Sequence, residues 1–150
     1  MSSVRLKRIP GIKDAPYIGA LLRLAHQEGR SRLLQALAER GLGDINQAHF
    51  GLFQYPPIDG MRPTDLAGRL GISKQALNHL LGQLEKLGYL RRRREPGNGH
   101  TAVYLTERGW LVLESNVATS RQLEVDWQRQ LGKQRFVALK SALQELTGFS

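Results

Sequence analysis

Apolar residues recur at intervals of three and four positions over most of the chain, and this pattern predicts a mainly α-helical protein. The first such segment spans 16–40 and ends before Gly41, a residue type that favours helix termination. Its apolar positions are Tyr17, Leu21, Leu24, Leu33, Leu34 and Leu37. A shorter helix is predicted over 44–54 with Asp44 as its N-cap, and the proline-containing segment 55–60 is predicted to be a loop.

Residues 63–88 carry the pattern of two helices joined by a tight turn. Pro63 favours the start of a helix over 63–70, and Gly71 permits a sharp turn. Ser73 is a suitable N-cap for the next helix, 74–88. The buried stripe of that helix is predicted to contain Leu77, Leu80 or Leu81, Leu84 and Leu87. Two helices joined in this way indicate a helix-turn-helix.

The pattern changes to a β-hairpin after Gly88. Strands are predicted over 89–94 and 101–105, joined by a turn at 96–99. Thr106 then caps a long helix over 107–131, and a last helix spans 133–147. The predicted fold class is therefore mainly α, a winged helix-turn-helix with a three-helix core and a β-hairpin wing, extended by N- and C-terminal helices.

The net charge of +9 is unevenly distributed along the chain. Residues 1–13 hold a balance of +4 and residues 61–110 one of +5, while the rest is nearly neutral. Localised positive charge indicates a polyanionic partner. Nucleic acid fits better than a membrane, because no basic amphipathic helix with aromatic anchors accompanies the charge.

The predicted helix 74–88 has the side chains that recognition of DNA requires. An α-helix fits the major groove, where each base pair presents its own pattern of donors and acceptors. Gln and Asn side chains can pair with adenine, a His can donate or accept, and a Ser at a helix start can help to hold a phosphate. The residues expected at DNA are Ser73, Lys74, Gln75, Asn78, His79 and Gln83.

The arginine run 91–94 lies on the first strand of the predicted wing. Neighbouring side chains of a strand point to opposite faces, so the four arginines cannot all face DNA. Arg92 and Arg94 are expected to face the duplex backbone, with Arg91 and Arg93 on the other side. The alternative is that all four are merely solvated.

The stretch "RPTDLAGRLGISKQALNHLLGQLEKLGYLRRRREPGNGHTAVYLTERGWLVLE" resembles the MarR family of bacterial and archaeal transcription regulators. The order "LxxxLxxLGYLxRR", wing, then "LTERG" entering a long helix is characteristic of that family, and the resemblance extends over 1–150. It implies a single MarR-like domain that forms a homodimer and binds palindromic double-stranded DNA. The wing tip departs from the family pattern, since it lacks an arginine. Asn98, His100 or Arg94 could make the contact instead.

Residues 42–106 suffice for a winged helix, so the flanking segments 14–41 and 107–148 need another role. Their apolar faces are expected to form a dimer interface, although they could instead pack within one subunit. The candidate interface residues are Leu113, Val117, Trp127, Leu139, Leu143 and Leu146. The basic arm, 1–13, could bind phosphates or be a disordered tail.

Other chemistry is poorly supported. The absence of cysteine excludes disulfides, thiolate metal sites and thiol-based sensing, and fits a cytoplasmic setting. The four histidines lack metal-ligand spacing, and neither a phosphate-binding glycine loop nor a nucleophile elbow occurs. Neither an enzyme nor a cofactor or metal is expected, and residues 1–13 lack the apolar core of a signal peptide.

The family resemblance also implies a small aromatic or anionic effector bound between the dimer helices and the winged part. The sequence does not identify such a ligand. The residues that could line its site are Tyr17, His26, His49, Phe53 and Trp110.

Two functions follow from these patterns. The first is a sequence-specific transcription regulator, a repressor that acts as a homodimer and is relieved by a ligand. The alternative is a winged-helix module that binds another protein, or binds DNA architecturally without sequence preference.

Overall fold

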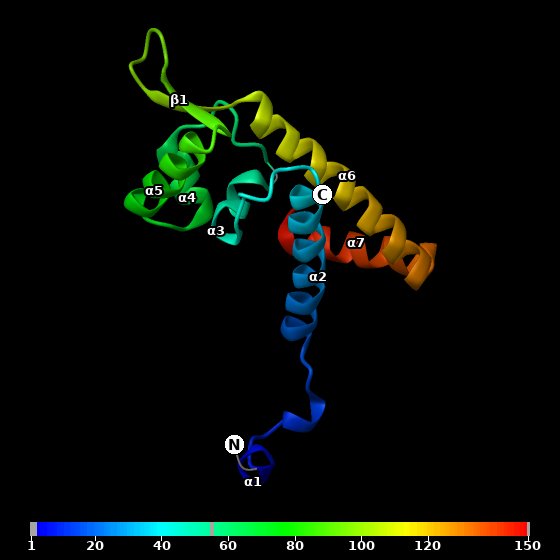
Figure 1. The fold of residues 1–150 in the computed structure, drawn as a ribbon. Coiled ribbons are helices and arrows are strands. Elements are labelled where there is room, and N and C mark those ends of the chain that lie inside the picture. Colours follow the sequence, from blue (N-terminus) through cyan, green and yellow to red (C-terminus); the bar gives the residue numbers. More distant parts are fainter. Residues whose placement is uncertain (1–2, 55, 150) are drawn as a thin grey trace.

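A computed structural model describes residues 3–54 and 56–149. The predictions for residues 1, 2, 55 and 150 lie outside this range. Along the chain the helices and strands are α1 (Ser3–Leu6), the 3₁₀ helix η1 (Ile12–Asp14), α2 (Ile18–Glu39), α3 (Gln47–Phe50), η2 (Gly51–Phe53), α4 (Pro63–Leu70), α5 (Lys74–Lys86), β1 (Leu90–Arg94), β2 (Thr101–Leu105), α6 (Glu107–Leu131) and α7 (Lys133–Thr147). Figure 1 shows α4, α5 and the hairpin gathered on one side, while α2 packs against α6.

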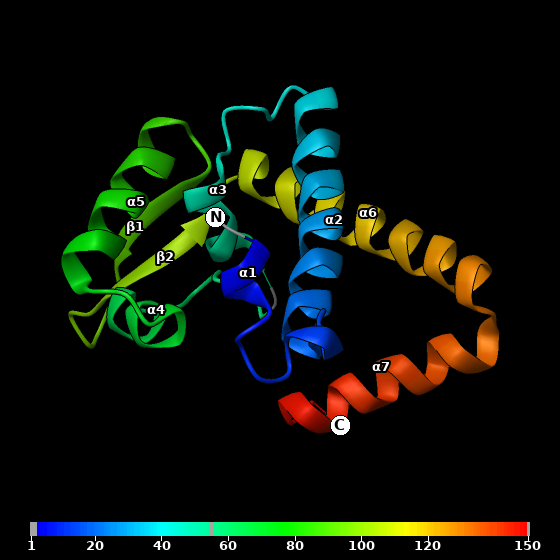
Figure 2. The same cartoon turned by 90° about the horizontal axis from the view of Figure 1, so that it is seen from below.

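The mainly helical winged-helix fold predicted from the sequence is confirmed. The predicted bounds of α6, α7, α4 and β2 agree with the structure, while α2 begins two residues later than predicted and α5 ends at Lys86. Figure 2 shows α7 turning back from the end of α6. A salt bridge of 2.8 Å between Lys140 and Glu124 links these two helices.

The helix predicted over 44–54 with Asp44 as its N-cap is wrong in its bounds and its cap. The α-helical part is only α3, followed directly by η2. Asn46 is the N-cap, and it forms a capping box with His49: its side chain accepts from the His49 backbone N–H, and Nδ1 of His49 accepts from the Asn46 N–H. Histidine in place of the usual Glu or Gln hides this cap from a sequence pattern.

The two strands form an antiparallel hairpin that pairs Leu90 with Leu105 and Arg92 with Val103. The outer edge of β2 is also covered. The loop before α4 pairs with it through the Val103 N–H, which donates to the Met61 carbonyl at 2.8 Å, and the Leu105 N–H, which donates to the Asp59 carboxylate at 2.8 Å. Strand β2 is therefore hydrogen-bonded along both edges, to β1 on one side and to the loop before α4 on the other.

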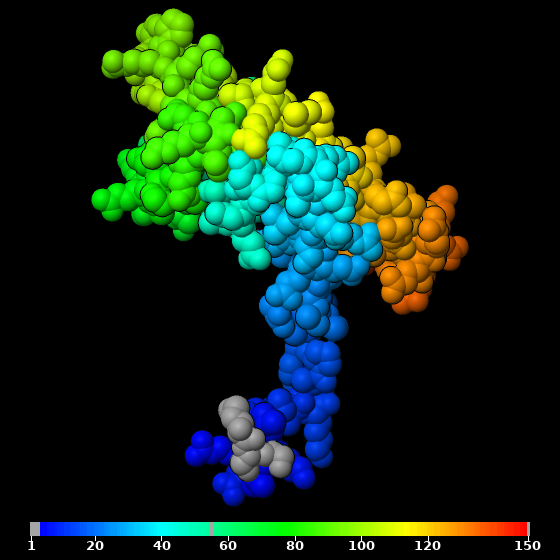
Figure 3. All heavy atoms as spheres, viewed as in Figure 1, coloured from blue at the N-terminus to red at the C-terminus, as the bar shows by residue number. Residues whose placement is uncertain are grey.

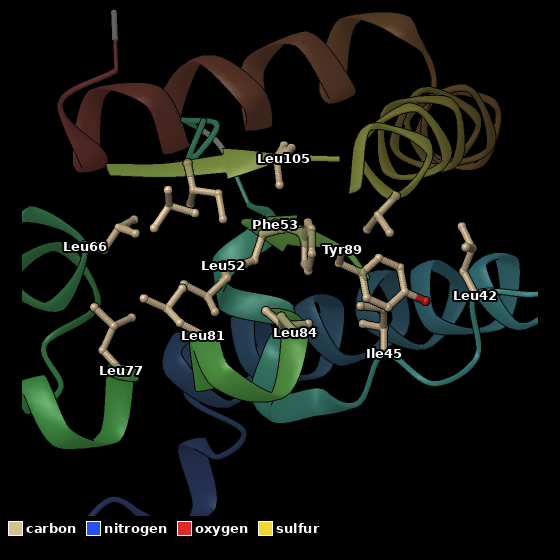
Figure 4. Packing of buried hydrophobic residues seen from close by; sticks show 14 of the residues in the cluster. Leu42, Ile45, Leu52, Phe53, Leu66, Leu77, Leu81, Leu84, Tyr89 and Leu105 are labelled. Atoms are coloured by element: carbon tan, nitrogen blue, oxygen red, sulfur yellow. The ribbon is translucent and has the colours of Figure 1, made fainter. Parts of the chain in front are cut away.

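The hydrophobic core lies between α4, α5, the hairpin, the first turns of α6 and the 42–58 segment (Figure 4). Leu77, Leu81 and Leu84 supply the stripe predicted for α5, and each is at most 1% exposed. Tyr89 is fully buried and packs edge-on against Phe53, with ring centroids 6.1 Å apart. This packing holds α5 in a fixed position relative to the wing.

Asp44 instead forms a polar cluster with Tyr89 and Arg108, which we call the clasp. The Tyr89 hydroxyl donates to the Asp44 carboxylate, and Arg108 from α6 donates to the same carboxylate at 3.0 Å. The Arg108 guanidinium also lies over the Tyr89 ring, 4.3 Å from its centroid. Burial would raise the pKa of Asp44, but the hydrogen bonds from Tyr89 and Arg108 together lower it below its ordinary value. Burial, reinforced by the Asp44 bond, raises the pKa of Tyr89.

The clasp predicts a defined pH dependence for Asp44→Asn. A carboxylate whose pKa is lowered by folding stabilises the native state above its unfolded pKa, and this contribution disappears as the pH falls through the folded pKa. At pH 7 we therefore expect the variant to lose about 1 kcal/mol in free energy of unfolding. The difference from wild type should shrink below about pH 4. Urea titrations at several pH values measure this, and a difference that is constant with pH would contradict the clasp.

The N-terminal part of α2 stands out from the body of the molecule (Figure 3). Its large apolar side chains are exposed, among them Ile18 at 70% and Leu24 at 52%. The stalk, defined here as residues 3–24, ends in α1 far from the wing (Figure 1). Within the described residues, no helix has the length and apolar character needed to cross a membrane.

Candidate nucleic-acid interface

Helix α5 presents an exposed polar face opposite its buried leucine stripe. Lys74, Gln75, Asn78 and His79 are all exposed, as predicted from their spacing. Ser73 caps the helix, because its hydroxyl oxygen accepts from the Ala76 N–H at 3.1 Å. The remaining N–H groups of the first turn point away from the helix and can approach a phosphate.

Gln83 differs from its predicted position on this face. It is half-buried, and its amide lies between two histidines. Its Oε1 is 2.8 Å from Nε2 of the buried His49, and its Nε2 is 3.1 Å from Nε2 of the exposed His79. Spacing alone could not reveal this contact, because His49 comes from α3, 34 positions earlier in the chain.

The wing places Arg92 and Arg94 on one side and Arg91 and Arg93 on the other. Arg92 is half-buried and bonded to Glu85 of α5, through its guanidinium at 3.1 Å and its backbone N–H at 3.0 Å. These two bonds, the side-chain bond first, lower the pKa of Glu85. Arg92 therefore fixes the wing against α5. Arg93 instead stacks on Tyr104, 4.4 Å from the ring centroid.

The wing tip is held by its own polar groups. The Glu95 N–H donates to the His100 carbonyl at 2.7 Å, and the His100 N–H donates to the Asn98 side chain at 2.9 Å. Nε of Arg94 donates to the Gly99 carbonyl at 3.1 Å. The Arg94 guanidinium thus lies at the tip, where the sequence has no arginine of its own.

The other candidate residues lie elsewhere. The described part of the basic arm, residues 3–13, forms the end of the stalk, apart from α5 and the wing (Figure 1). Among the dimer candidates, Val117, Leu139 and Leu146 are exposed, whereas Leu143 is half-buried. Leu113 and Trp127 are half-buried and line a cavity within the chain.

That cavity has a volume of about 690 Å³ and lies between α2, α6 and the α3–η2 segment. Its lining includes His26, Arg30, Phe50, Phe53, Asn116 and Trp127. Nε of Arg30 and Oδ1 of Asn116 are buried and lack a hydrogen-bond partner in the described part of the chain. The Arg30 guanidinium is held in place by the Gln47 carbonyl at 2.8 Å and by the Phe50 ring.

Three of the five residues predicted to line an effector site lie outside this cavity. His26 and Phe53 do line it. Tyr17 instead donates to the Gly11 carbonyl in the stalk, His49 is buried beside Gln83, and Trp110 lies near the wing base. Arg30 also lines the cavity but was not among the predicted residues. Its neighbours in the sequence do not indicate this position, because it depends on contacts between α2 and α3.

The helix-turn-helix, the hairpin beside α5 and the buried core define a winged helix-turn-helix protein. Residues 56–99 match the model of the MarR family. The family resemblance predicted from the sequence is thereby confirmed, and the chain has the fold of MarR-family transcription regulators.

Solved structures share this fold over most of the chain. The reduced form of MarR from E. coli superposes with a TM-score of 0.70 at 22% identity, covering 87% of this chain and 96% of that one. The transcriptional regulator Tm0710 from Thermotoga maritima gives 0.59 at 25% identity, covering 87% and 91%. A mutant of MepR from S. aureus bound to an oligodeoxyribonucleotide gives 0.58 at 20% identity, covering 88% and 96%. Among curated proteins, no sequence matches significantly.

Proposed function

We propose that this chain is a sequence-specific DNA-binding transcription regulator that represses as a homodimer on a palindromic operator. The observation that carries the proposal is the exposed polar face of α5 beside a wing that Glu85 and Arg92 fix to it. MepR, a structural relative with the same fold, is known bound to an oligodeoxyribonucleotide. A regulator of this kind acts in the cytoplasm, where bacterial and archaeal DNA lies.

We assign base contacts to Gln75, Asn78 and His79, and phosphate contacts to Ser73 and Lys74. At the wing, Arg94 is the stronger candidate for a backbone contact, because Arg92 is already bonded to Glu85. Asn98 and His100 stabilise the wing tip, because the His100 N–H donates to the Asn98 side chain. We assign them an indirect role in DNA binding, which is to maintain the shape of the tip.

A homodimer is supported by apolar side chains that the isolated chain leaves in water. These gather on the stalk and on α7, where Leu139 is 38% and Leu146 is 77% exposed. Large contiguous apolar faces are rarely left exposed in a soluble monomer. A second copy of the chain would cover them by the symmetric contact of a two-fold dimer.

Selection from random DNA duplexes at near-physiological salt tests the proposal. A homodimeric regulator should enrich an inverted repeat whose half-site centres lie about 10 base pairs apart. Its preference for this site over random duplex should be at least about 10³-fold. Binding without an enriched motif would support an architectural role, and absence of binding would support a protein-interaction module.

Asn78→Ala and Arg94→Ala should affect DNA binding in different ways. Loss of Asn78 removes a base contact, so it should weaken operator binding by about 1–3 kcal/mol and relax specificity at one base step. Loss of Arg94 removes a backbone contact, so it should weaken all sequences alike and lower the salt slope by about one. Titrations of operator and random duplex at several salt concentrations separate the two. Unchanged operator preference in Asn78→Ala would contradict the assigned face.

We further propose that a small aromatic anion relieves repression by binding in the cavity. The unpaired Nε–H of Arg30 and the aromatic rings of Phe50 and Trp127 suit a ligand with a carboxylate and a ring. The cavity lies between the helices of the proposed dimer and the winged part, so its occupation can change their relative position. In the same binding assay, an effector of this class should release operator DNA.

A further inference from the structure

Three side chains form a hydrogen-bonded chain from the protein interior to the exposed face of α5. It runs from His49 through Gln83 to His79, over distances of 2.8 and 3.1 Å. His49 is 2% exposed, whereas His79 is exposed. We call these three hydrogen-bonded side chains the histidine relay. It connects a buried imidazole to one that the proposed function places at a DNA base.

The protein backbone sets the direction of the first bond in the relay. The Asn46 N–H lies 3.3 Å from Nδ1 of His49 and can only donate. Nδ1 of His49 therefore carries no proton, so the proton of the neutral ring is on Nε2. That Nε2–H donates to Oε1 of Gln83, which turns the NH₂ group of Gln83 toward His79.

The amide of Gln83 then sets the protonation of His79. An NH₂ group can only donate, so Nε2 of His79 accepts and the neutral ring carries its proton on Nδ1. An unconstrained imidazole in water prefers its proton on Nε2, so the relay holds His79 in the less favoured tautomer. Within the described part of the chain, Nδ1 of His79 has no hydrogen-bond partner, so this N–H is available to a ligand.

We propose that His49 and Gln83 are positioning residues that fix His79 as an Nδ1–H donor, and that this donor selects against cytosine at the base it contacts. Guanine presents two acceptors, N7 and O6, at its major-groove edge, whereas cytosine presents only its amino donor. The selection of a base rests on the proposed function, while the tautomer is a property of the free protein. The two can therefore be tested separately.

Nitrogen-15 NMR of the full chain tests the tautomer of His79 directly, under conditions in which the imidazole is neutral. Wild-type His79 should carry its proton on Nδ1. Gln83→Glu keeps an oxygen for His49 but replaces the donor that faces His79 with an acceptor, so the proton should move to Nε2. Gln83→Leu should also release it to Nε2. The control Gln35→Leu makes the same exchange on α2 and should leave His79 unchanged.

A purely structural role for Gln83 would leave the tautomer of His79 unaffected in all of these variants. The relay is overturned if wild-type His79 carries its proton on Nε2. It is equally overturned if the proton stays on Nδ1 in Gln83→Glu.

Binding to operator duplexes varied at each position tests the selection of a base. The wild type should discriminate against cytosine about tenfold at one position. Both Gln83 variants should lose most of this discrimination. It is measured as the ratio of two affinities of the same variant, so a change in overall affinity does not affect it. Gln83→Leu should have no further effect on discrimination in a His79→Ala background, because it acts through His79.

The outcomes distinguish the relay from the proposed function. If the protein prefers an operator but no position of that operator depends on His79, the selection of a base by His79 is overturned and the proposed regulator is not. The absence of any preferred operator overturns that selection and contradicts the proposed regulator as well.

Discussion

Gly109→Ala is expected to lower the free energy of unfolding by about 3 kcal/mol, although alanine is the better helix former. Gly109 lies in the first turn of α6, in the "LTERG" stretch, and is buried. A Cβ at this position would overlap the Tyr89 carbonyl oxygen and would lie 3.0 Å from a methyl group of Leu105. The helix could accept the extra atom only by moving away from the hairpin.

The backbone around Tyr89 cannot move away from such a Cβ without breaking other bonds. The Tyr89 carbonyl accepts from the Thr106 N–H at 3.1 Å, and the Thr106 hydroxyl donates to the Gly88 carbonyl at 2.5 Å. The same hydroxyl oxygen caps α6 by accepting from the Gly109 N–H at 3.2 Å. One close contact therefore joins the end of α5, the wing and the start of α6, so the clash affects all three.

Thermal and urea unfolding followed by circular dichroism measure this effect, at equal chain concentrations because a dimer's stability depends on concentration. We expect the midpoint temperature to fall by about 10 °C. Gly68→Ala is the matched control, because Gly68 is a helical glycine of α4 with open space around its missing Cβ. It should raise the stability by about 0.5–1 kcal/mol. Equal stability of Gly109→Ala and wild type would contradict the docking of α6.

Gly109 illustrates which parts of this fold could be predicted from the sequence. Periodicity and caps predicted α4, α6, α7 and the wing, because leucine spacing, Ser73 and Thr106 act within a few residues of one another. No local rule explains why Gly109 must be a glycine, since its close neighbour is a carbonyl 20 positions earlier in the sequence. The prediction of Asp44 as a cap is wrong for the same reason. Its partners, Tyr89 and Arg108, are distant in the chain, so a local rule does not include them.

The candidate nucleic-acid interface also has a part that could be predicted from the sequence and a part that could not. The exposed residues of α5 follow from helical spacing, and so did the separation of the wing arginines into two faces. The partners that occupy Gln83 and Arg92 did not follow, because they depend on how α3 packs on α5 and how the wing packs on Glu85. Tertiary contacts decide which polar side chains remain free for DNA, and a sequence pattern gives only the candidates.

Leu24→Glu is expected to convert the proposed dimer into a folded monomer with greatly reduced DNA affinity. Leu24 is 52% exposed on the stalk, so a glutamate there is solvated in the isolated chain and should leave its core intact. In a two-fold dimer the change occurs twice, and each buried, unpaired carboxylate opposes association by at least about 3 kcal/mol. The dissociation constant of the dimer should therefore rise by about four orders of magnitude.

Sedimentation over a range of concentrations measures the dimer, and operator titration measures the consequence for DNA. A monomer engages one half-site and loses the second set of contacts, so its operator affinity should approach its affinity for random duplex. Gln35→Glu adds the same charge to the exposed face of α2 beside the body of the molecule, and it should leave both measurements close to wild type. A dimer of unchanged stability in Leu24→Glu would show that the stalk is not the interface. The apolar face of α7, with Leu139 and Leu146, would then have to form the dimer without it.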